Sequence, residues 1–270
     1  MNTIITSTVV LYKHPLEMLE NFLSSYSSSV LRAQSEMQVT FHLYIVNNDI
    51  TQKVDYKANL LDAKYSNISF EFIHSEKNGG YGYGNNLVIP RLKSDYHLVV
   101  NPDIIFCEDT FLQAITIMQE RKEFGLLTPA VYDQHQKQQF SCKKNPTLFS
   151  QFLRFTLKHK KPFFKKYLEK YEYQDHSYEK EIYDIPNCTG CFMFFQTPIF
   201  KEVKGFDEQF FYYMDDCDLS RRALEISRIL YTPEVKVLHE YQGDAYKNKK
   251  LRNEAIKSAF KYWRKWGGIF

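Results

Sequence analysis

Residues 4–12, IITSTVVLY, are almost entirely β-branched or apolar and show no alternation of polar positions. Such a run predicts a strand that is covered on both faces, as the strands of a parallel sheet are. Further strands are predicted over residues 41–46, 68–73 and 97–100, separated by segments long enough for helices, the first of which opens at His14-Pro15. Strands that alternate with helices indicate an α/β fold with a doubly wound, mostly parallel central sheet.

Polar clusters follow three of these strands. They are Asn47-Asn48-Asp49, the glycine-rich loop 78–86 and Asn101-Pro102-Asp103. Ligands of open parallel sheets bind outside the carboxyl ends of the strands, so we expect the three clusters to line one crevice. The same arrangement occurs in many nucleotide-binding enzymes and does not by itself identify the ligand.

The second half of the chain is less regular. The strand pattern breaks over residues 141–181, which contain a basic and aromatic stretch at 154–167, and it resumes at 191–195. Residues 229–238 are predicted as two short strands broken at Pro233, because proline cannot donate a hydrogen bond to a sheet. A basic helix is predicted over residues 247–266.

Composition narrows the protein class. The 270 residues carry a net charge of only +3. The overall charge of the protein therefore gives no indication of its partners. No apolar run is long enough to span a membrane, and the N-terminal residues lack the features of a secretory signal. Five scattered cysteines suit a reducing compartment better than a disulfide framework. We therefore expect a soluble, cytoplasmic protein.

Two acidic clusters are candidates for chemistry. Asp103 follows a strand and is placed to bind a divalent cation together with diphosphate oxygens, or else it belongs to an Asx-Pro turn that caps a helix. Asp215, Asp216 and Asp218 repel one another unless a cation or a helix N-terminus offsets their charges. If a helix starts there, Asp218 pairs with Arg221 or Arg222 and Asp216 stays free to accept a proton; the alternative is an acidic first turn with no chemistry.

Other motifs are weaker. The glycines of loop 78–86 allow a backbone to approach a ligand, but the loop has neither the P-loop nor the dinucleotide-binding pattern. His239 ends a predicted strand and is either a metal ligand or a buried structural histidine. Cys188 and Cys191 have C-x-x-C spacing without a second pair, so zinc is not expected.

The order of these motifs resembles the family 2 inverting glycosyltransferases of GT-A fold, most closely the rhamnosyltransferase-like branch of bacterial surface polysaccharide (O-antigen or capsule) synthesis. The similarity spans residues 3–240. The motifs that carry it are residues 8–12 (TVVLY), 45–49 (IVNND), 78–86, 101–104 (NPDI), 205–219 (GFDEQFFYYMDDCDL) and 237–239 (VLH).

The resemblance implies a domain organisation. Residues 1–240 would form a single GT-A catalytic domain, with a nucleotide-sugar-binding half at 1–105, an irregular basic and aromatic insertion at 134–182 and an acceptor and catalytic half at 183–240. Residues 241–270 would add a basic amphipathic helix.

The resemblance also implies roles for individual residues. Asp216 matches the catalytic base, and Asp103 and His239 match the ligands of Mg²⁺ or Mn²⁺. The positions that match donor-binding residues are Tyr12, Asn47, Asn78, Gly80, Tyr81, Asn85, Asn101 and Asp103; those expected to support the acceptor side are Gly190, Asp215, Asp218 and Arg222. One departure leaves the nucleotide open: Asn47-Asn48-Asp49 stands where the family usually has DNGS or DNxS.

The expected reaction is a single in-line displacement that moves rhamnose from dTDP-rhamnose to a glycan acceptor carried on a lipid. Alternatives are a UDP-linked sugar donor, a catalytically silent partner subunit, and a nucleic-acid-binding module; the last leaves the acidic cluster 215–218 without a purpose. Residues 154–167 and the helix 247–266 are predicted either to rest on an anionic membrane surface, at the inner face of the plasma membrane, or to be solvated.

Overall fold

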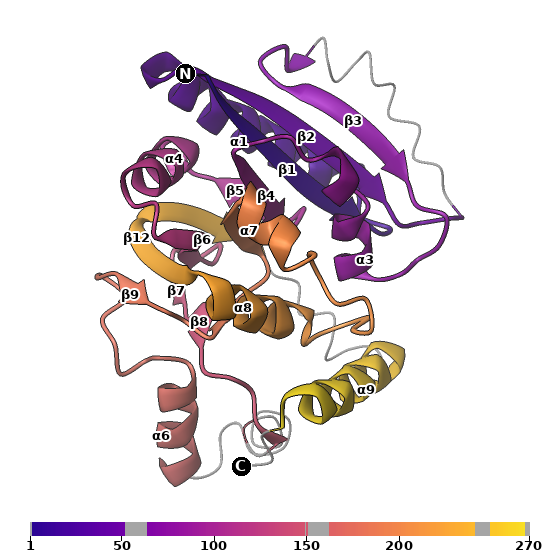
Figure 1. The fold of residues 1–270 in the computed structure, drawn as a ribbon, viewed down its shortest axis with the longest axis vertical. Coiled ribbons are helices and arrows are strands. Elements are labelled where there is room, and N and C mark those ends of the chain that lie inside the picture. Colours follow the sequence, from indigo (N-terminus) through magenta and orange to yellow (C-terminus); the bar gives the residue numbers. More distant parts are fainter. Residues whose placement is uncertain (1, 52–63, 149, 151–161, 241–248, 268–270) are drawn as a thin grey trace.

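A computed structural model describes residues 2–51, 64–148, 150, 162–240 and 249–267. Its centre is one large mixed sheet with the strand order β3-β2-β1-β4-β11-β6-β12-β5, and β7 (Gln138–Gln139) and β9 (Ile182–Tyr183) pair at its side. Figure 1 shows this sheet running through the molecule, with helices on both of its faces.

The first four strands form the parallel part that the sequence predicts. They are β1 (Thr3–Leu11), β2 (Val39–Asn47), β3 (Ser69–His74) and β4 (Tyr96–Val100), and they pair with one another in parallel. β1 is buried on both faces from Ile5 onward, because Val9 packs in one core cluster and Val10 in another. The continuous apolar run of residues 4–12 is therefore explained by cover on both sides.

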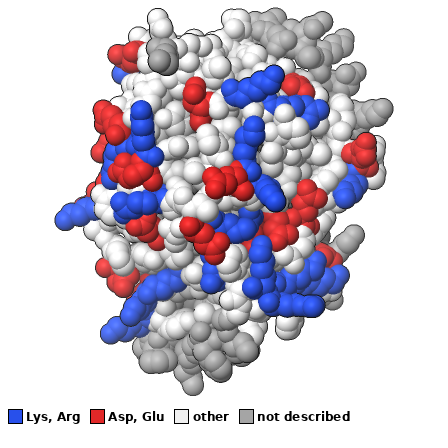
Figure 2. All heavy atoms as spheres, viewed as in Figure 1, with Lys and Arg blue, Asp and Glu red and all other residues white. Residues whose placement is uncertain are grey.

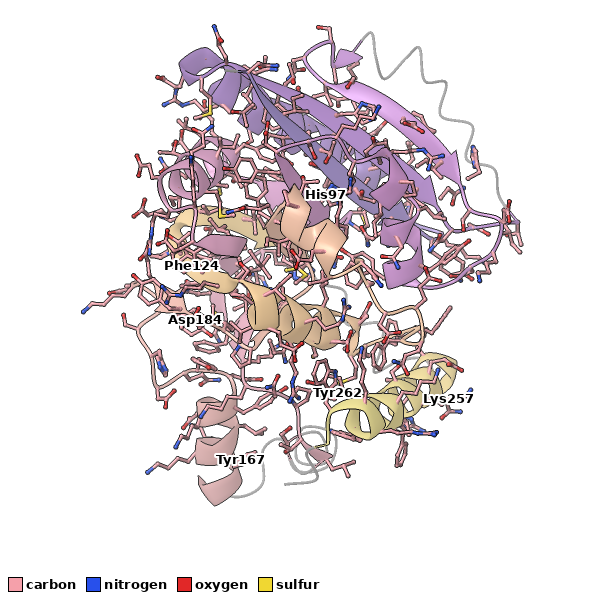
Figure 3. The ribbon with its side chains drawn as sticks, in the orientation of Figure 1. His97, Phe124, Tyr167, Asp184, Lys257 and Tyr262 are labelled. Carbon is pink, nitrogen blue, oxygen red and sulfur yellow. The ribbon has the colours of Figure 1, made fainter. Side chains whose placement is uncertain are left out.

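Two sets of helices provide this cover. α1 (Leu16–Glu36) and α4 (Thr110–Glu120) pack on one face of the sheet. The short helix α3 (Tyr81–Asn86), α7 (Thr197–Glu202) and α8 (Asp215–Ile226) cover the other face. His97 of β4 lies on that second face, packed against Phe200 of α7 (Figure 3). The result is a three-layered α/β domain, as expected.

The other half of the sheet is mixed. β11 (Phe192–Gln196) runs antiparallel between β4 and β6 (Phe124–Tyr132), and β12 (Arg228–His239) is parallel to β6. β5 (Ile104–Phe106) pairs antiparallel with β12. No element is predicted above for residues 104–132, where the structure forms β5, α4 and β6.

One sequence prediction is wrong. Residues 229–238 do not form two short strands, because β12 continues through Pro233 as one strand. Its register against β6 shifts between Thr232 and Lys236, so the proline lies within a bulge where no ladder hydrogen bond is required.

The predicted insertion 134–182 is only partly regular. It contains β7 and β8 (Cys142–Lys143), the helix α6 (Pro162–Tyr171) and the beginning of β9; β8 pairs with β10 (Asn187–Cys188) in a small second sheet. Two further helical elements are the 3-10 helix η1 (Ile89–Arg91) and α9 (Lys249–Trp266). Residues 151–161 and 241–248 lie outside the described residues. They include most of the basic stretch 154–167 and the start of the predicted C-terminal helix. No helix within the described ranges has both the length and the apolar character needed to cross a bilayer.

Candidate active site

The carboxyl ends of β1, β2 and β4 meet at one edge of the sheet. Leu11 is the register partner of Asn47, and Val9 is the partner of Val100, so Tyr12, Asn47 and Asn101 follow neighbouring strands at the same edge. Asn47 is buried and accepts a hydrogen bond from the Asp49 backbone, whereas the Tyr12 ring is half exposed. An aromatic ring and two amide side chains therefore lie at this edge of the sheet, where the crevice is predicted.

Asp103 and His239 lie side by side although 136 positions separate them in the sequence. The antiparallel pairing of β5 with β12 places His239 opposite Ile104, and the Glu240 N–H donates to the Asp103 carbonyl at 3.0 Å. This brings His239 Nε2 to 3.3 Å from Asp103 Oδ2. Both side chains are largely buried.

This pair fits a divalent cation. Asp103 Oδ1 is buried without a hydrogen-bond partner in the described part of the chain, which leaves a carboxylate oxygen available as a ligand. Carboxylate and imidazole are both metal-binding groups. The described ranges contain no cluster of three or more potential ligands, so an ion here would complete its shell from elsewhere. Mg²⁺ and its relatives are commonly held in this way, by one or two protein carboxylates together with substrate phosphates.

Asp216 lies in the first turn of α8 and is only partly buried. Its Oδ2 accepts a hydrogen bond from the Gly190 N–H at 3.1 Å, and its Oδ1 accepts one from the Cys217 N–H at 2.8 Å. A Cβ added to Gly190 would lie 2.9 Å from the Asp216 Cβ, so only glycine allows this close approach. The two N–H groups fix the orientation of the Asp216 carboxylate.

The segment 190–191 connects the two acidic clusters. The Gly190 carbonyl accepts a hydrogen bond from the Tyr81 hydroxyl at 3.1 Å, and the Cys191 carbonyl accepts one from the Asn101 N–H at 3.0 Å. Burial raises the pKa of the Cys191 thiol to about 12, and the charges of Asp103 and Asp216 both add to the shift. Because Gly190 binds Asp216 and the adjacent Cys191 binds Asn101, the two acidic clusters lie near each other.

Asp215 differs from its neighbour. It is buried, and burial followed by the charge of Asp216 holds the pKa of its carboxyl well above the ordinary value. Burial and a neighbouring negative charge both disfavour ionisation, so Asp215 is not suited to accept a proton as a free carboxylate. Tyr81 lies between the clusters: its pKa is raised by burial and further by Asp215 and Asp103.

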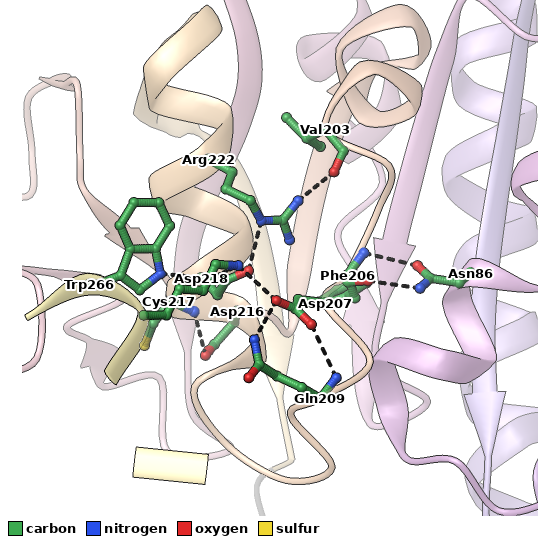
Figure 4. Close-up of polar contacts among 11 residues, drawn as sticks. Asn86, Val203, Phe206, Asp207, Gln209, Asp216, Cys217, Asp218, Arg222 and Trp266 are labelled. Atoms are coloured by element: carbon green, nitrogen blue, oxygen red, sulfur yellow. Dashed lines mark hydrogen bonds and ion pairs between the residues drawn. The ribbon is translucent and has the colours of Figure 1, made fainter. Parts of the chain in front are cut away.

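Of the two arginines predicted to pair with Asp218, Arg222 is the one that does. The Arg222 Nε donates to Asp218 Oδ2 at 2.7 Å, as the spacing of four residues predicts. Arg221 instead lies over the ring of Trp266, at 4.2 Å from its centroid. Arg222 also donates to the Val203 carbonyl, which ties α8 to the end of α7 (Figure 4).

The glycines of loop 78–86 have a packing role. Gly80 adopts a φ of +90°, and a Cβ there would meet the Phe211 carbonyl oxygen at 2.4 Å. A Cβ on Gly82 would lie 2.7 Å from Phe206, and one on Gly84 would lie 2.7 Å from Val10. The glycines therefore let α3 press against β1 and the segment 206–211.

The two asparagines predicted at this loop are placed differently. Asn78 is half-buried at its start, where its Oδ1 accepts a hydrogen bond from the Gly80 N–H. Asn85 is fully buried and donates to the Tyr81 carbonyl.

Sequence reasoning missed Asn86. Its amide exchanges two hydrogen bonds with the Phe206 backbone, at 2.8 and 2.9 Å, and so joins the glycine-rich loop to the segment that leads into α8 (Figure 4). No local signal reveals this pairing, because the partners are 120 residues apart.

Comparisons with known proteins agree with this architecture. No protein-family model matches the chain. The chain is 29% identical to Rhamnosyltransferase WbbL of Escherichia coli (strain K12) over 197 residues, which cover 68% of this chain and 69% of that protein. It is 24% identical to N-acetylglucosaminyl-diphospho-decaprenol L-rhamnosyltransferase of Mycobacterium tuberculosis (strain CDC 1551 / Oshkosh) over 233 residues, 82% of this chain and 71% of the other.

Two solved structures share the fold. One is a mannosyltransferase from Pyrobaculum calidifontis in complex with GDP-Man and Mn²⁺, with a TM-score of 0.63, 13% identity and 98% of this chain covered. The other is S. aureus TarS 1–349 in complex with UDP, with a TM-score of 0.58, 14% identity and 95% of this chain covered. This chain spans 65% of each of these two proteins' chains.

These findings confirm the expected resemblance to family 2 rhamnosyltransferases, the GT-A fold and the assignment as a glycosyltransferase.

Proposed function

We propose that this glycosyltransferase moves rhamnose from dTDP-rhamnose to a hydroxyl group of a lipid-linked glycan, with inversion at the anomeric carbon, during bacterial surface polysaccharide synthesis. The observation that carries this proposal is that the segment 190–191 binds Asp216 on one side and, on the other, the backbone of Asn101, two residues before the Asp103–His239 pair. The donor sugar is inferred from the names of the two rhamnosyltransferases to which the chain is similar. The departure at residues 47–49 keeps a UDP-linked sugar as the alternative.

The donor would occupy the crevice at the carboxyl ends of β1, β2 and β4. Tyr12 offers an exposed aromatic face for the base, and Asn47 and Asn101 offer amide groups for the ribose and diphosphate. Asn78, Gly80, Tyr81 and Asn85 build the loop and short helix that close this wall.

Asp103 and His239 would hold Mg²⁺ or Mn²⁺ through the buried Oδ1 and the neighbouring imidazole. When bound, such an ion stabilises the negative charge that grows on a departing diphosphate. The same ion type is present in the mannosyltransferase structure that shares this fold.

Asp216 would act as the general base. Its carboxylate is partly exposed and is oriented by two backbone N–H groups. It would take the proton of the acceptor hydroxyl while that oxygen attacks the anomeric carbon and the bond to the diphosphate breaks. One displacement of this kind inverts the configuration.

The outer face of α9 would contact the membrane that carries the acceptor. Phe260 is 64% exposed and Ile256 is 46% exposed; they lie one turn apart and outside the stripe of the buried Ala255, Ala259 and Tyr262. The helix carries seven Lys and Arg residues against one acidic residue, Glu254. In Figure 2, Lys and Arg gather over α9, whereas the rest of that face mixes both charges. Exposed apolar residues among cations suit an anionic lipid surface.

Vesicle sedimentation tests the membrane contact. The double variant Ile256→Ser/Phe260→Ser should lose binding to phosphatidylglycerol vesicles. The matched control is Leu31→Ser, which removes a comparably exposed apolar side chain from α1 and should bind normally. Equal binding by all three proteins would remove α9 from the proposal.

The reaction itself is tested with purified protein, Mn²⁺, dTDP-rhamnose and an N-acetylglucosaminyl-diphospho-lipid acceptor. The proposal predicts a rhamnosylated lipid whose anomeric configuration, measured by NMR, is opposite to that of the donor. Parallel reactions with UDP-linked sugars decide between the two donor classes. Retention of configuration, or no transfer from any of these donors, would contradict the proposal.

A further inference from the structure

Helix α9 packs directly on the segment that leads into α8. Its buried side chains Ala259 and Tyr262 form one apolar cluster with Phe210, Met214 and Cys217. Figure 3 shows Tyr262 on the side of α9 that faces the rest of the molecule. Lys261 of the same helix donates to the Gln209 carbonyl at 2.7 Å. The entry into α8 is therefore covered by a helix from the far end of the described chain.

The polar contacts of α9 end on Asp218. Its carboxylate is fully buried; Oδ2 is taken by Arg222 of its own helix. Its Oδ1 accepts a hydrogen bond from Trp266 Nε1 at 2.7 Å and forms an ion pair with Lys265 Nζ, also at 2.7 Å. Figure 4 shows the Trp266 indole meeting this carboxylate. A buried charge is tolerated only when it is paired and hydrogen-bonded, so α9 supplies contacts that Asp218 requires.

Lys265 makes a second contact that extends this attachment. Its Nζ also lies 2.7 Å from Asp207 Oδ2, in the segment that Asn86 joins to the glycine-rich loop. One ammonium group thus holds both ends of the stretch 207–218, which contains Asp215 and Asp216.

The backbone before α8 needs such support. Tyr213 and Met214 are consecutive non-glycine residues in the left-handed region, with φ of 63° and 67°. Residues in this conformation persist only where the surrounding structure fixes them. Met214 belongs to the cluster that Tyr262 completes, so α9 provides part of that support.

We propose that Trp266 and Lys265 are positioning residues for Asp216. Their bonds to Asp218 fix the first turn of α8, and Asp216 lies in the same turn, two residues earlier, against Gly190. This inference rests on the proposed role of Asp216 as the base. In addition to the membrane contact proposed for its outer face, α9 would then orient the proposed base.

The central variant is Trp266→Phe, which deletes the indole N–H and keeps an aromatic ring. We expect kcat to fall about 10-fold, since a displacement of an ångström or less at a catalytic group has effects of this size or larger. The KM for the nucleotide sugar should stay within about twofold, because the donor wall is built from other elements. The matched control is Trp263→Phe, which deletes an indole bond from the same helix to the Pro146 carbonyl and should keep the native kcat.

A double-variant cycle separates positioning from general damage. If Trp266 acts through Asp216, then Trp266→Phe should slow the native protein but have no further effect in an Asp216→Asn background. If the losses in kcat from Trp266→Phe and Asp216→Asn multiply in the double variant, or if the Trp263→Phe control loses as much kcat as Trp266→Phe, the inference is overturned. A native rate for Asp216→Asn would instead overturn the proposed base, which the cycle reports separately.

Hydrogen exchange provides a readout that is independent of activity. Amides of residues 215–218 should exchange faster in Trp266→Phe, while amides of β1 and β2 remain unchanged. If Trp266→Phe does not fold, Lys265→Met serves in the same experiments, since it removes the other donor to Oδ1. Unchanged exchange at residues 215–218 in a folded variant would also overturn the inference.

Discussion

Two halves of the molecule hold their candidate site residues by different means: residues 1–105, proposed to bind the nucleotide sugar (the nucleotide half), and residues 183–240, proposed to bind the acceptor (the acceptor half). In residues 1–105, Tyr12, Asn47 and Asn101 follow regular parallel strands, and the register of the sheet brings them together. In the acceptor half, Asp216 follows an irregular stretch and depends on contacts from Gly190 and, through Asp218, from α9. The first arrangement is set by secondary structure, the second by side chains from distant parts of the chain.

This difference predicts how substitutions act in each half. At the end of a buried strand, the sheet fixes the backbone position even when the side chain is replaced. A residue at an unusual backbone turn keeps its place only while its neighbours do. Variants in the nucleotide half should therefore alter binding locally, whereas variants in the acceptor half should alter geometry at a distance.

The largest effect is expected in the acceptor half. Asp216→Asn removes the proposed base while keeping a side chain of the same size, so kcat should fall by about 10²–10⁴-fold. Donor affinity should hardly change. Steady-state kinetics together with nucleotide titration measure both quantities, and a native kcat would remove Asp216 from the mechanism.

The second-largest loss of activity is expected from a substitution in the nucleotide half. Asp103→Asn removes the charged ligand of the proposed cation site, so activity should fall by about 10²–10³-fold, the scale for loss of a major charge stabiliser. Unlike Asp216→Asn, it should also weaken the Mn²⁺-dependent thermal stabilisation by dTDP. Chelator should abolish activity in the native protein. Full activity in excess chelator would contradict the cation site.

A smaller effect tests the contact on which Asp216 rests. Gly190→Ala places a Cβ 2.9 Å from that of Asp216, so one of the two must move. Overpacking of this kind costs about 1–3 kcal/mol of unfolding free energy, measured by urea denaturation. Activity should fall with donor affinity preserved, which would locate the damage in the acceptor half. Native stability and activity would show that this close contact is not required.

The smallest effect concerns pH. Burial raises the pKa of Asp215, so above the ordinary carboxyl value of about 3.9 the folded state binds more protons than the unfolded state. The contribution of Asp215 to stability is therefore highest at low pH and declines as the pH rises toward its folded-state pKa. Asp215→Asn removes this decline, so its stability relative to the native protein should increase between pH 4 and pH 8.

Urea denaturation at both pH values measures this prediction. The control is Asp184→Asn, which alters an exposed carboxylate whose pKa is lowered by Arg228 and which should show the opposite trend. The same pH dependence in native protein and Asp215→Asn would contradict the assigned protonation state.

Much of the structure of residues 1–105 could be predicted because each strand, and the polar residues after it, can be recognised from a short stretch of sequence. The apolar runs at 4–12, 41–46 and 97–100 each predict a strand, and the polar residues after them predict the crevice. The pair Asp218–Arg222 is also local, since four residues make one helical turn.

The remaining features depend on tertiary contacts. Asp103 and His239 meet only because β5 pairs with β12, and β5 is too short to give a sequence pattern. The bulge that lets β12 pass Pro233 and the attachment of Trp266 to Asp218 have no local signal either. The resemblance to a known family supplied the roles of Asp216 and Gly190 that periodicity alone does not give.

The central claim is that Asp103, His239 and Asp216 serve one donor site. Its most direct test is a crystal structure with Mn²⁺ and dTDP, in which anomalous scattering locates the manganese. The account predicts a peak within bonding distance of Asp103 and His239, with the diphosphate beside it in the crevice that Asp216 faces. Manganese bound elsewhere, or a nucleotide on another face of the sheet, would contradict it.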